Sequence, residues 1–91
     1  MDAVYQALAD PTRRRILTLL RKRPHTSGEI AAFFPSAWPT ISRHLGVLRQ
    51  AGLILAERNG QHIHYELNTS VVEDIIQQLL DWTGKGGSDH A

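Results

Sequence analysis

Short polar side chains and an arginine, near the start of an expected helix, are the residues of this 91-residue chain best suited to chemistry. Pro39, Thr40, Ser42 and Arg43 lie on or beside the outer face of a helix that we expect over residues 38–51. Short side chains let a helix backbone approach base edges, and an arginine can form two hydrogen bonds with a guanine. The pattern predicts contact with DNA, although any amphipathic helix also has a polar outer face.

Trp38, in the first turn of the same helix, permits two interpretations. An exposed indole would pack against a thymine methyl or a sugar and contribute to DNA contact. Burial against the preceding helix would instead make it a core residue.

A second group of polar side chains lies at the tip of an expected β-hairpin. Residues 53–58 and 61–67 alternate apolar and polar side chains on either side of Asn59-Gly60, a strong hairpin-turn sequence. Arg58 and Gln61 flank this turn and are placed to reach phosphate or the minor groove. A solvated turn would have the same composition.

The expected two-residue turn fixes a pairing register for the hairpin. The pairs outward from the turn are Arg58 with Gln61, Glu57 with His62, Ala56 with Ile63, Leu55 with His64, and Ile54 with Tyr65.

Other chemistry finds little support in the sequence. His62 and His64 project from one face of a strand, but two imidazoles without a third ligand form a poor metal site, and the chain has no cysteine. We therefore expect no metal. Because no nucleophile is paired with a base and no glycine-rich phosphate loop follows a strand, we predict no catalytic residue, enzyme activity or cofactor.

Charge is segregated along the chain. Nine Arg and Lys residues lie between Pro11 and Arg58 against two Glu residues, an excess of seven positive charges, and both flanking segments are acidic. This distribution suits a middle that meets polyphosphate and ends that meet each other or solvent. An ordinary solvated face would carry the same charges.

Capping residues mark the helices that precede this middle segment. Residues 2–8 are expected to form a short first helix, and Asp10 to cap a second over residues 11–22. Thr26 and Glu29 form a capping box at the start of a brief third helix. The apolar residues of this third helix, expected to be buried, are Ile30, Phe33 and Phe34.

A Pro35-Ser36 break joins the third helix to the fourth, which is expected to start at Ser36 or Ala37 and to end at Gly52. Its core stripe consists of Ile41, Leu45 and Leu48. With the hairpin, the order is helix, turn, helix, wing, typical of proteins that place the second helix in a major groove. The expected fold is mainly α with a small β-hairpin, a winged helix-turn-helix.

The last helix, expected to be capped by Asn68 or Thr69, carries an apolar stripe wider than one small core requires. The excess favours a homodimer, and so does the small core that 91 residues can form. We expect one domain over residues 1–83 and a disordered tail over residues 84–91. Because there is no run of about 18 apolar residues and no secretory signal, the expected location is the cytoplasm.

Two segments carry a family resemblance: LADPTRRRIL at residues 8–17 and PTISRHLGVLRQAGLI at residues 39–54. They closely resemble ArsR-type bacterial repressors, and the chain looks like the metal-free SdpR-like subgroup. The resemblance implies a winged-helix homodimer that reads an operator with its fourth helix. The implied interface residues, from the first and last helices, are Val4, Leu8, Ile75, Leu79 and Trp82.

The family's DNA-contact positions correspond here to Thr40, Ser42, Arg43 and His44 on the helix and to Arg58 and the tip on the wing. The chain departs from the pattern at Ala37, where relatives usually place a capping serine, and at Trp38, where they commonly have a polar side chain. The metal-ligand sets of the arsenic-type and zinc-type sensors are missing.

The leading hypothesis is a dimeric transcriptional repressor of a near-palindromic double-stranded DNA operator. The resemblance also implies repression of its own operon and relief by capture on a membrane or protein partner. One alternative is a protein-interaction module that has kept the winged helix without binding DNA. Another is a sensor of a metal or an unidentified small ligand.

Overall fold

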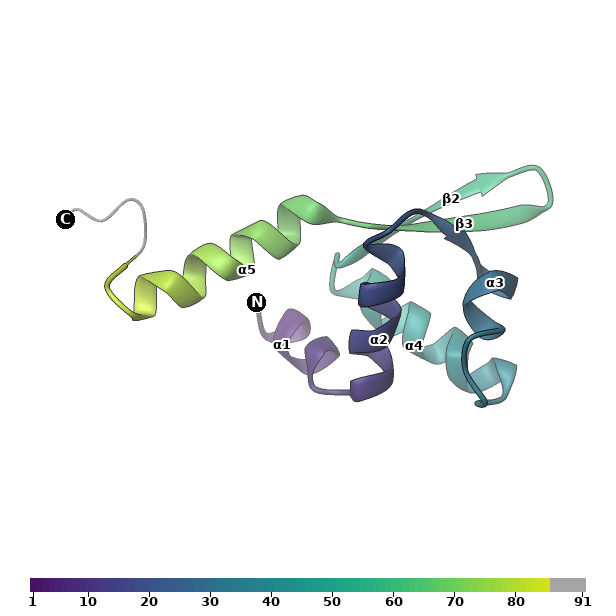
Figure 1. Ribbon diagram of the computed structural model, residues 1–91, viewed down its shortest axis with the longest axis horizontal. Coiled ribbons are helices and arrows are strands. Elements are labelled where there is room, and N and C mark those ends of the chain that lie inside the picture. Colours follow the sequence, from purple (N-terminus) through teal and green to yellow (C-terminus); the bar gives the residue numbers. More distant parts are fainter. Residues whose placement is uncertain (86–91) are drawn as a thin grey trace.

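The computed structural model describes residues 1–85, which form five helices and a small sheet (Figure 1). The elements are, in order, α1 (Asp2–Leu8), α2 (Pro11–Leu20), β1 (His25–Thr26), α3 (Ser27–Ala31), α4 (Trp38–Gln50), β2 (Ile54–Asn59), β3 (His62–Leu67) and α5 (Thr69–Trp82). Helices α1 to α4 gather into one body, and α5 and the β2–β3 hairpin project from it in opposite directions (Figure 1). The expected mainly α architecture with a small hairpin is confirmed.

Side-chain caps start α2 and α3 as the sequence predicts. The Asp10 carboxylate accepts a hydrogen bond from the Arg13 backbone N–H at 3.0 Å, and this bond holds the pKa of Asp10 below its ordinary value. At α3, Thr26 Oγ1 accepts from the Glu29 N–H at 3.1 Å, and Glu29 accepts from the Thr26 N–H at 2.9 Å. The Thr26 N–H likewise lowers the pKa of Glu29. Both helix starts are therefore fixed locally.

Helix α3 is shorter than expected and buries less. It ends at Ala31, and only Ile30 within it is buried. Phe33, predicted to be buried, is 61% exposed, whereas Phe34 is half-buried against the core. Because the helical spacing stops before Phe33, its ring no longer follows Ile30 onto the core face.

The sheet has three strands within residues 1–85, one more than the sequence predicted. The additional strand is β1, which pairs antiparallel with β3, so the strand order is β1-β3-β2. With only two residues, His25 and Thr26, it is too short to leave a period-two pattern. It joins the loop before α3 to the base of the hairpin.

The hairpin register differs from the expected one by two residues. Asn59 pairs with His62, so the turn is Gly60-Gln61 rather than Asn59-Gly60. Gly60 has a φ of 68°, and no other residue type in the described chain has a positive φ. A type I′ turn would need positive φ at both central residues, whereas a type II′ turn needs it only at the first. Because Gly60 has a positive φ and Gln61 does not, the turn fits type II′.

The corrected pairs are Arg58 with Ile63, Glu57 with His64, Ala56 with Tyr65, Leu55 with Glu66, and Ile54 with Leu67. Because the side-chain period of a strand is two, this shift leaves each side chain on the same face of the hairpin as in the expected register.

One hydrophobic core receives side chains from every helix. Its buried members are Val4, Ala7, Ile16, Leu20, Ile30, Ile41, Leu45, Leu48, Leu53, Ile54 and Ile75. The stripe expected on α4 is confirmed, because Ile41, Leu45 and Leu48 are each at most 2% exposed. Burying this stripe fixes which face of α4 remains at the surface.

Gly52 and Asn68 join the ends of α4 and α5. Gly52 has a φ of 79°, the conformation of a glycine that follows a helix. Asn68 is the N-cap residue of α5, but its side chain does not bond to the first amides of that helix. The side-chain amide donates instead to the Gly52 carbonyl at 2.9 Å. This bond ties the start of α5 to the end of α4.

Residues 84 and 85, part of the predicted disordered tail, close α5. Gly84 has a φ of 78°, and the Lys85 N–H donates to the Leu80 carbonyl at 3.1 Å, the pattern of a helix C-terminus ended by glycine. The rest of the predicted tail, residues 86–91, lies outside the described residues. No helix in the described part of the chain is long and apolar enough to cross a lipid bilayer.

Candidate nucleic-acid interface

Helix α4 begins without help from a side-chain cap. Of the two expected starts, the structure selects Ala37 as the N-cap residue, and no side chain bonds to the first-turn amides. Pro39 in the first turn has no N–H and so adds no unmet donor. The exposed start of α4 therefore combines a free helix terminus with short side chains, a combination that favours approach to an anion.

The face of α4 opposite its core stripe is free. Pro39, Ser42 and Arg43 are exposed on it, and Thr40 is half-buried at its edge. Trp38 is 49% exposed, so it is not a core residue. The structure thus brings five of the expected helix contacts to one accessible region.

The same face carries residues that the sequence reasoning did not select. Gly46 and Arg49 are exposed and follow Ser42 by four and seven residues, so they continue its line along the helix. A Cβ added at Gly46 would meet nothing within 4 Å. Helical spacing alone would have been sufficient to find these two residues.

His44, expected to contact DNA, lies in the interior instead. Its side chain is buried, and its Nδ1 is 3.2 Å from Arg13 Nη1 on α2. Because an arginine can only donate, Nδ1 accepts, and the proton of the neutral ring lies on Nε2, which is 4.0 Å from an Asp10 carboxylate oxygen. His44 therefore differs from the other expected helix contacts, because it is buried against α2 and does not lie on the exposed face of α4.

Burial lowers the pKa of His44 below its ordinary value. The Asp10 carboxylate acts in the opposite direction, and the nearby charges of Arg13 and Arg43 act in the same direction as burial. The net effect favours the neutral ring, which is the form that can accept the hydrogen bond from Arg13.

Arg13, which the sequence analysis counted only as a positive charge, has a structural role. Besides His44, it donates to the carbonyls of Ala7 at 2.8 Å and Gln6 at 3.1 Å, at the end of α1. Arg14 donates to the next carbonyl, Leu8, at 2.7 Å. These arginines close the C-terminus of α1, where backbone carbonyls lack helical partners, so not all of the basic middle is available to polyphosphate.

The hairpin presents the remaining expected contacts. Arg58, at the end of β2, and Gln61, in the turn, are both exposed. In Figure 1 the tip projects beyond the helical body, past α3. The arrangement of an exposed helix face with a projecting hairpin suits contact with a duplex at two places.

Comparisons with known proteins agree with this geometry. The chain matches the model of a helix-turn-helix domain over residues 8–57. It is 46% identical over 89 residues to the transcriptional repressor SdpR of Bacillus subtilis (strain 168), covering 98% of this chain and 99% of that protein. The crystal structure of an ArsR family transcriptional regulator superimposes with a TM-score of 0.85 and 28% identity, covering 98% of this chain and 92% of that one.

The chain belongs to the ArsR family. A second solved structure, an ArsR-like transcriptional regulator from Rhodococcus sp. RHA1, has a TM-score of 0.86 at 26% identity and covers 92% of this chain and 77% of that one. ArsR family members are transcriptional regulators and not enzymes. The winged helix-turn-helix fold expected from the sequence is confirmed.

The residues of this ArsR family chain expected at a dimer interface divide into two groups. Val4 and Ile75 are each 6% exposed and belong to the core of the single chain, so they add little to its exposed surface. Leu8 is half-buried, Leu79 is 43% exposed and Trp82 is 69% exposed.

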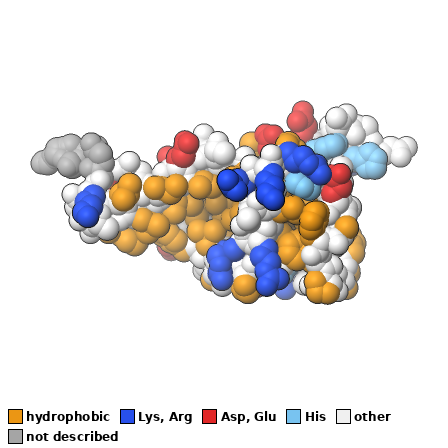
Figure 2. Space-filling model, in the orientation of Figure 1, with side chains coloured by type: hydrophobic (Ala, Val, Ile, Leu, Met, Phe, Trp, Pro, Cys, Tyr) orange, Lys and Arg blue, Asp and Glu red, His pale blue; other side chains and the backbone are white. Residues whose placement is uncertain are grey.

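A large hydrophobic surface surrounds Leu79 and Trp82, the two exposed residues of this expected interface. Ile76 and Leu80 on α5 are 51% and 39% exposed. Figure 2 shows hydrophobic side chains along α5 that continue onto the body of the molecule. The ring of Trp82 lies 6.4 Å from that of Tyr5 on α1, so the surface spans α1 and α5.

The hairpin histidines do not form a metal-binding cluster in this structure. His62 pairs across the hairpin with Asn59 and His64 with Glu57. Throughout residues 1–85, no three His, Asp or Glu side chains lie close enough to hold a metal ion.

Proposed function

We propose that this protein is a cytoplasmic transcriptional repressor that binds a near-palindromic double-stranded DNA operator as a homodimer. Each subunit places the outer face of α4 in a major groove, with Pro39, Thr40, Ser42 and Arg43 nearest the bases. Trp38 contacts the sugar or thymine edge, and the wing residues Arg58 and Gln61 contact the neighbouring backbone or minor groove.

The observation that carries this proposal is the division of α4 into two faces. Ile41 and Leu48 are fully buried, whereas Ser42 and Arg43 are exposed on the opposite side. The core therefore holds the helix rigidly while its polar face is free, which is the condition for direct contact with base edges.

The hydrophobic surface on α5 supports the homodimer. Ile76, Leu79, Leu80 and Trp82 are large apolar residues, each 39% exposed or more. A contiguous apolar surface of this kind on a small domain marks an association site. Two-fold symmetry then places the two half-sites about 10 to 10.5 base pairs apart, or a multiple of that spacing.

The proposed mode of regulation is steric exclusion of RNA polymerase from the operator. Support for a repressor comes from the 46% identity with a protein named transcriptional repressor SdpR. In this proposal the protein also represses its own operon, and a membrane or protein partner relieves repression by capturing the dimer. No metal is required in this proposal.

Titration of the full chain onto its own upstream DNA, followed by fluorescence anisotropy at several salt concentrations, tests the DNA-binding proposal. We expect specific binding that weakens as the logarithm of salt rises, and much weaker binding to a scrambled fragment. Equal weak affinity for both fragments would favour the protein-interaction module instead.

Arg43→Ala sharpens the test. If Arg43 reads a guanine, this variant loses about 1–3 kcal/mol on the specific fragment and much less on random DNA. Lys85→Ala is the matched control, because it removes one positive charge just beyond the C-terminus of α5 and should leave specific affinity unchanged. Equal losses on specific and random DNA would make Arg43 a phosphate contact.

A further inference from the structure

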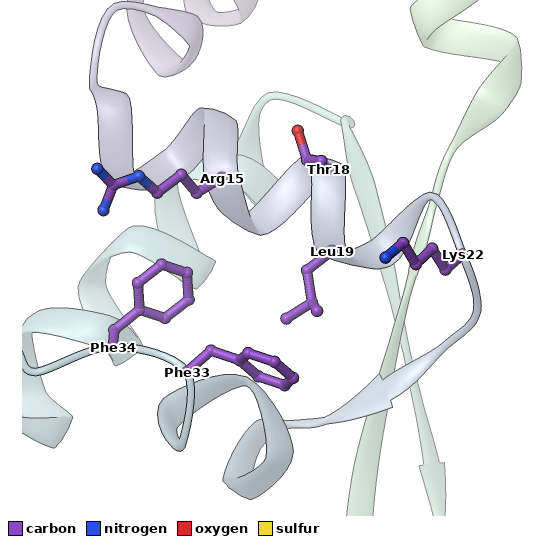
Figure 3. Close-up of a pocket in the computed structure, with 6 residues that line it drawn as sticks. All are labelled: Arg15, Thr18, Leu19, Lys22, Phe33 and Phe34. Carbon is purple, nitrogen blue, oxygen red and sulfur yellow. The ribbon is translucent and has the colours of Figure 1, made fainter.

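A cavity between α2 and the segment that follows α3 lies apart from both the α4 face and the α5 surface. Its volume is about 240 Å³, and its lining residues are Arg15, Thr18, Leu19, Lys22, Phe33 and Phe34. Figure 3 shows Leu19 pointing from α2 toward the two phenylalanine rings, with Arg15 at one end and Lys22 at the other. The cavity thus has an apolar centre between two cations.

The α2 wall of this cavity is a single helix face. Arg15, Thr18 and Leu19 are spaced at i, i+3 and i+4 and therefore share one side of α2, and Lys22 follows in the turn after the helix ends at Leu20. Arg15 lies on α2 and Lys22 lies just beyond the end of this helix, so the two cations flank the apolar centre (Figure 3). Neither side chain forms a hydrogen bond or an ion pair with another described residue, whereas Arg23 on the adjacent loop does pair with Glu29.

The opposite wall contains an aromatic ring that is held in place but not covered. Phe33 lies edge-on to the buried ring of His25, with the two centroids 6.2 Å apart. Even so, 61% of Phe33 is exposed. An anchored, exposed ring loses little conformational freedom on binding, so it is suited to stack on another flat ring.

We propose that this cavity binds small aromatic carboxylates. The ligand ring packs between Leu19 and the two phenylalanines, and its carboxylate pairs with Lys22 or Arg15. Charge complementarity selects the anion, because the lining has two cations and no acidic residue. The aromatic centre selects a ring over an aliphatic chain, and a ligand of one or two fused rings matches the 240 Å³ volume.

The test titrates 2-naphthoate into the full-length ¹⁵N-labelled protein and follows amide chemical shifts. We expect shifts confined to α2 and residues 26–34, with a Kd on the order of 1 mM, the affinity typical of a ligand with about 13 non-hydrogen atoms. The neutral 2-naphthamide should bind at least about threefold more weakly, and acetate should produce no shifts at these residues. Equal binding of the amide, or shifts located elsewhere, would overturn the proposal.

Two variants measure separately what the aromatic ring and the positive charge contribute to binding. Phe33→Ala should weaken naphthoate binding by about three- to tenfold through loss of the stacking partner. Lys22→Gln should weaken it by about two- to fivefold, the effect of one exposed charge. Both residues are exposed, so we expect both variants to fold.

Controls of matched chemistry lie outside the cavity. Leu55→Ala removes an exposed apolar side chain from β2, and Lys85→Gln removes a positive charge from the end of α5. Neither should change the naphthoate Kd. Should either control weaken binding as much as its partner variant, the cavity would not be the site.

Discussion

The guanidinium of Arg13 on α2 lies 3.2 Å from the Nδ1 atom of His44 on α4. The same guanidinium holds two carbonyls at the end of α1. Arg13 therefore links the helix that begins the chain to the buried face of the helix that we propose enters the DNA groove. The orientation of α4 depends on this contact as well as on its apolar stripe.

Replacing Arg13 should reduce stability. Arg13→Lys keeps the charge but cannot serve three acceptors in the geometry of the guanidinium fork, so we expect the free energy of unfolding to fall by about 1–3 kcal/mol. Urea denaturation measures this loss. Arg14→Lys is the matched control, because Arg14 forms a single exposed hydrogen bond, and it should lose less. Equal losses for the two variants would contradict the central role of Arg13.

The stability of the protein should fall as His44 becomes protonated. Burial lowers the pKa of folded His44 below the ordinary value of 6.5, so between these two pKa values the unfolded chain binds more protons than the folded chain. The free energy of unfolding therefore has its full value above about pH 7. It decreases as pH falls through 6.5, by no more than about 1.4 kcal/mol per pH unit.

Comparison of the wild type with His44→Gln isolates this effect, because a glutamine oxygen can still accept from Arg13 but does not titrate in this range. The difference in unfolding free energy between the two proteins should change from pH 7.5 to pH 5.5. A constant difference would show that His44 is not the group responsible. The remaining histidines contribute to both proteins and so cancel in the difference.

Gly46 tests how closely α4 approaches DNA. In the interior of a helix, Gly46→Ala should raise the free energy of unfolding by about 0.5–1 kcal/mol, because the added methyl meets nothing within 4 Å. If α4 lies in the groove, the methyl stands between backbone and DNA, and binding should weaken by about 1–3 kcal/mol. A stabilised variant with unchanged DNA affinity would place the middle of α4 away from the bases.

Leu79 tests the proposed dimer. Leu79→Asp would bury a charge at the contact between subunits, so we expect the dimer dissociation constant to rise at least about tenfold in analytical ultracentrifugation. Gln77→Asp is the matched control: it adds the same charge to α5, two residues away and on nearly the opposite side at about 100° per residue. An unchanged dimer in the Leu79 variant would refute this interface.

Local sequence signals predicted those features that are decided within a few residues. The Thr26 and Glu29 capping box, the Asp10 cap and the Ile41 stripe each act over one or two helical turns. Hairpin pairing was predicted less well, because Asn59-Gly60 and Gly60-Gln61 both offer a glycine to the turn. The choice between them depends on which residue must take a positive φ.

Taken alone, the amino-acid sequence determined the helices, the core face of α4, the exposed position of Arg43 and the family to which the chain belongs. Only the tertiary structure decided that His44 is internal, that Arg13 closes α1, that Phe33 is exposed and that β1 joins the sheet. The reason is distance along the chain. Arg13 and His44 are 31 residues apart, so their contact depends on how complete helices pack together. No pattern within a few residues of the sequence predicts it.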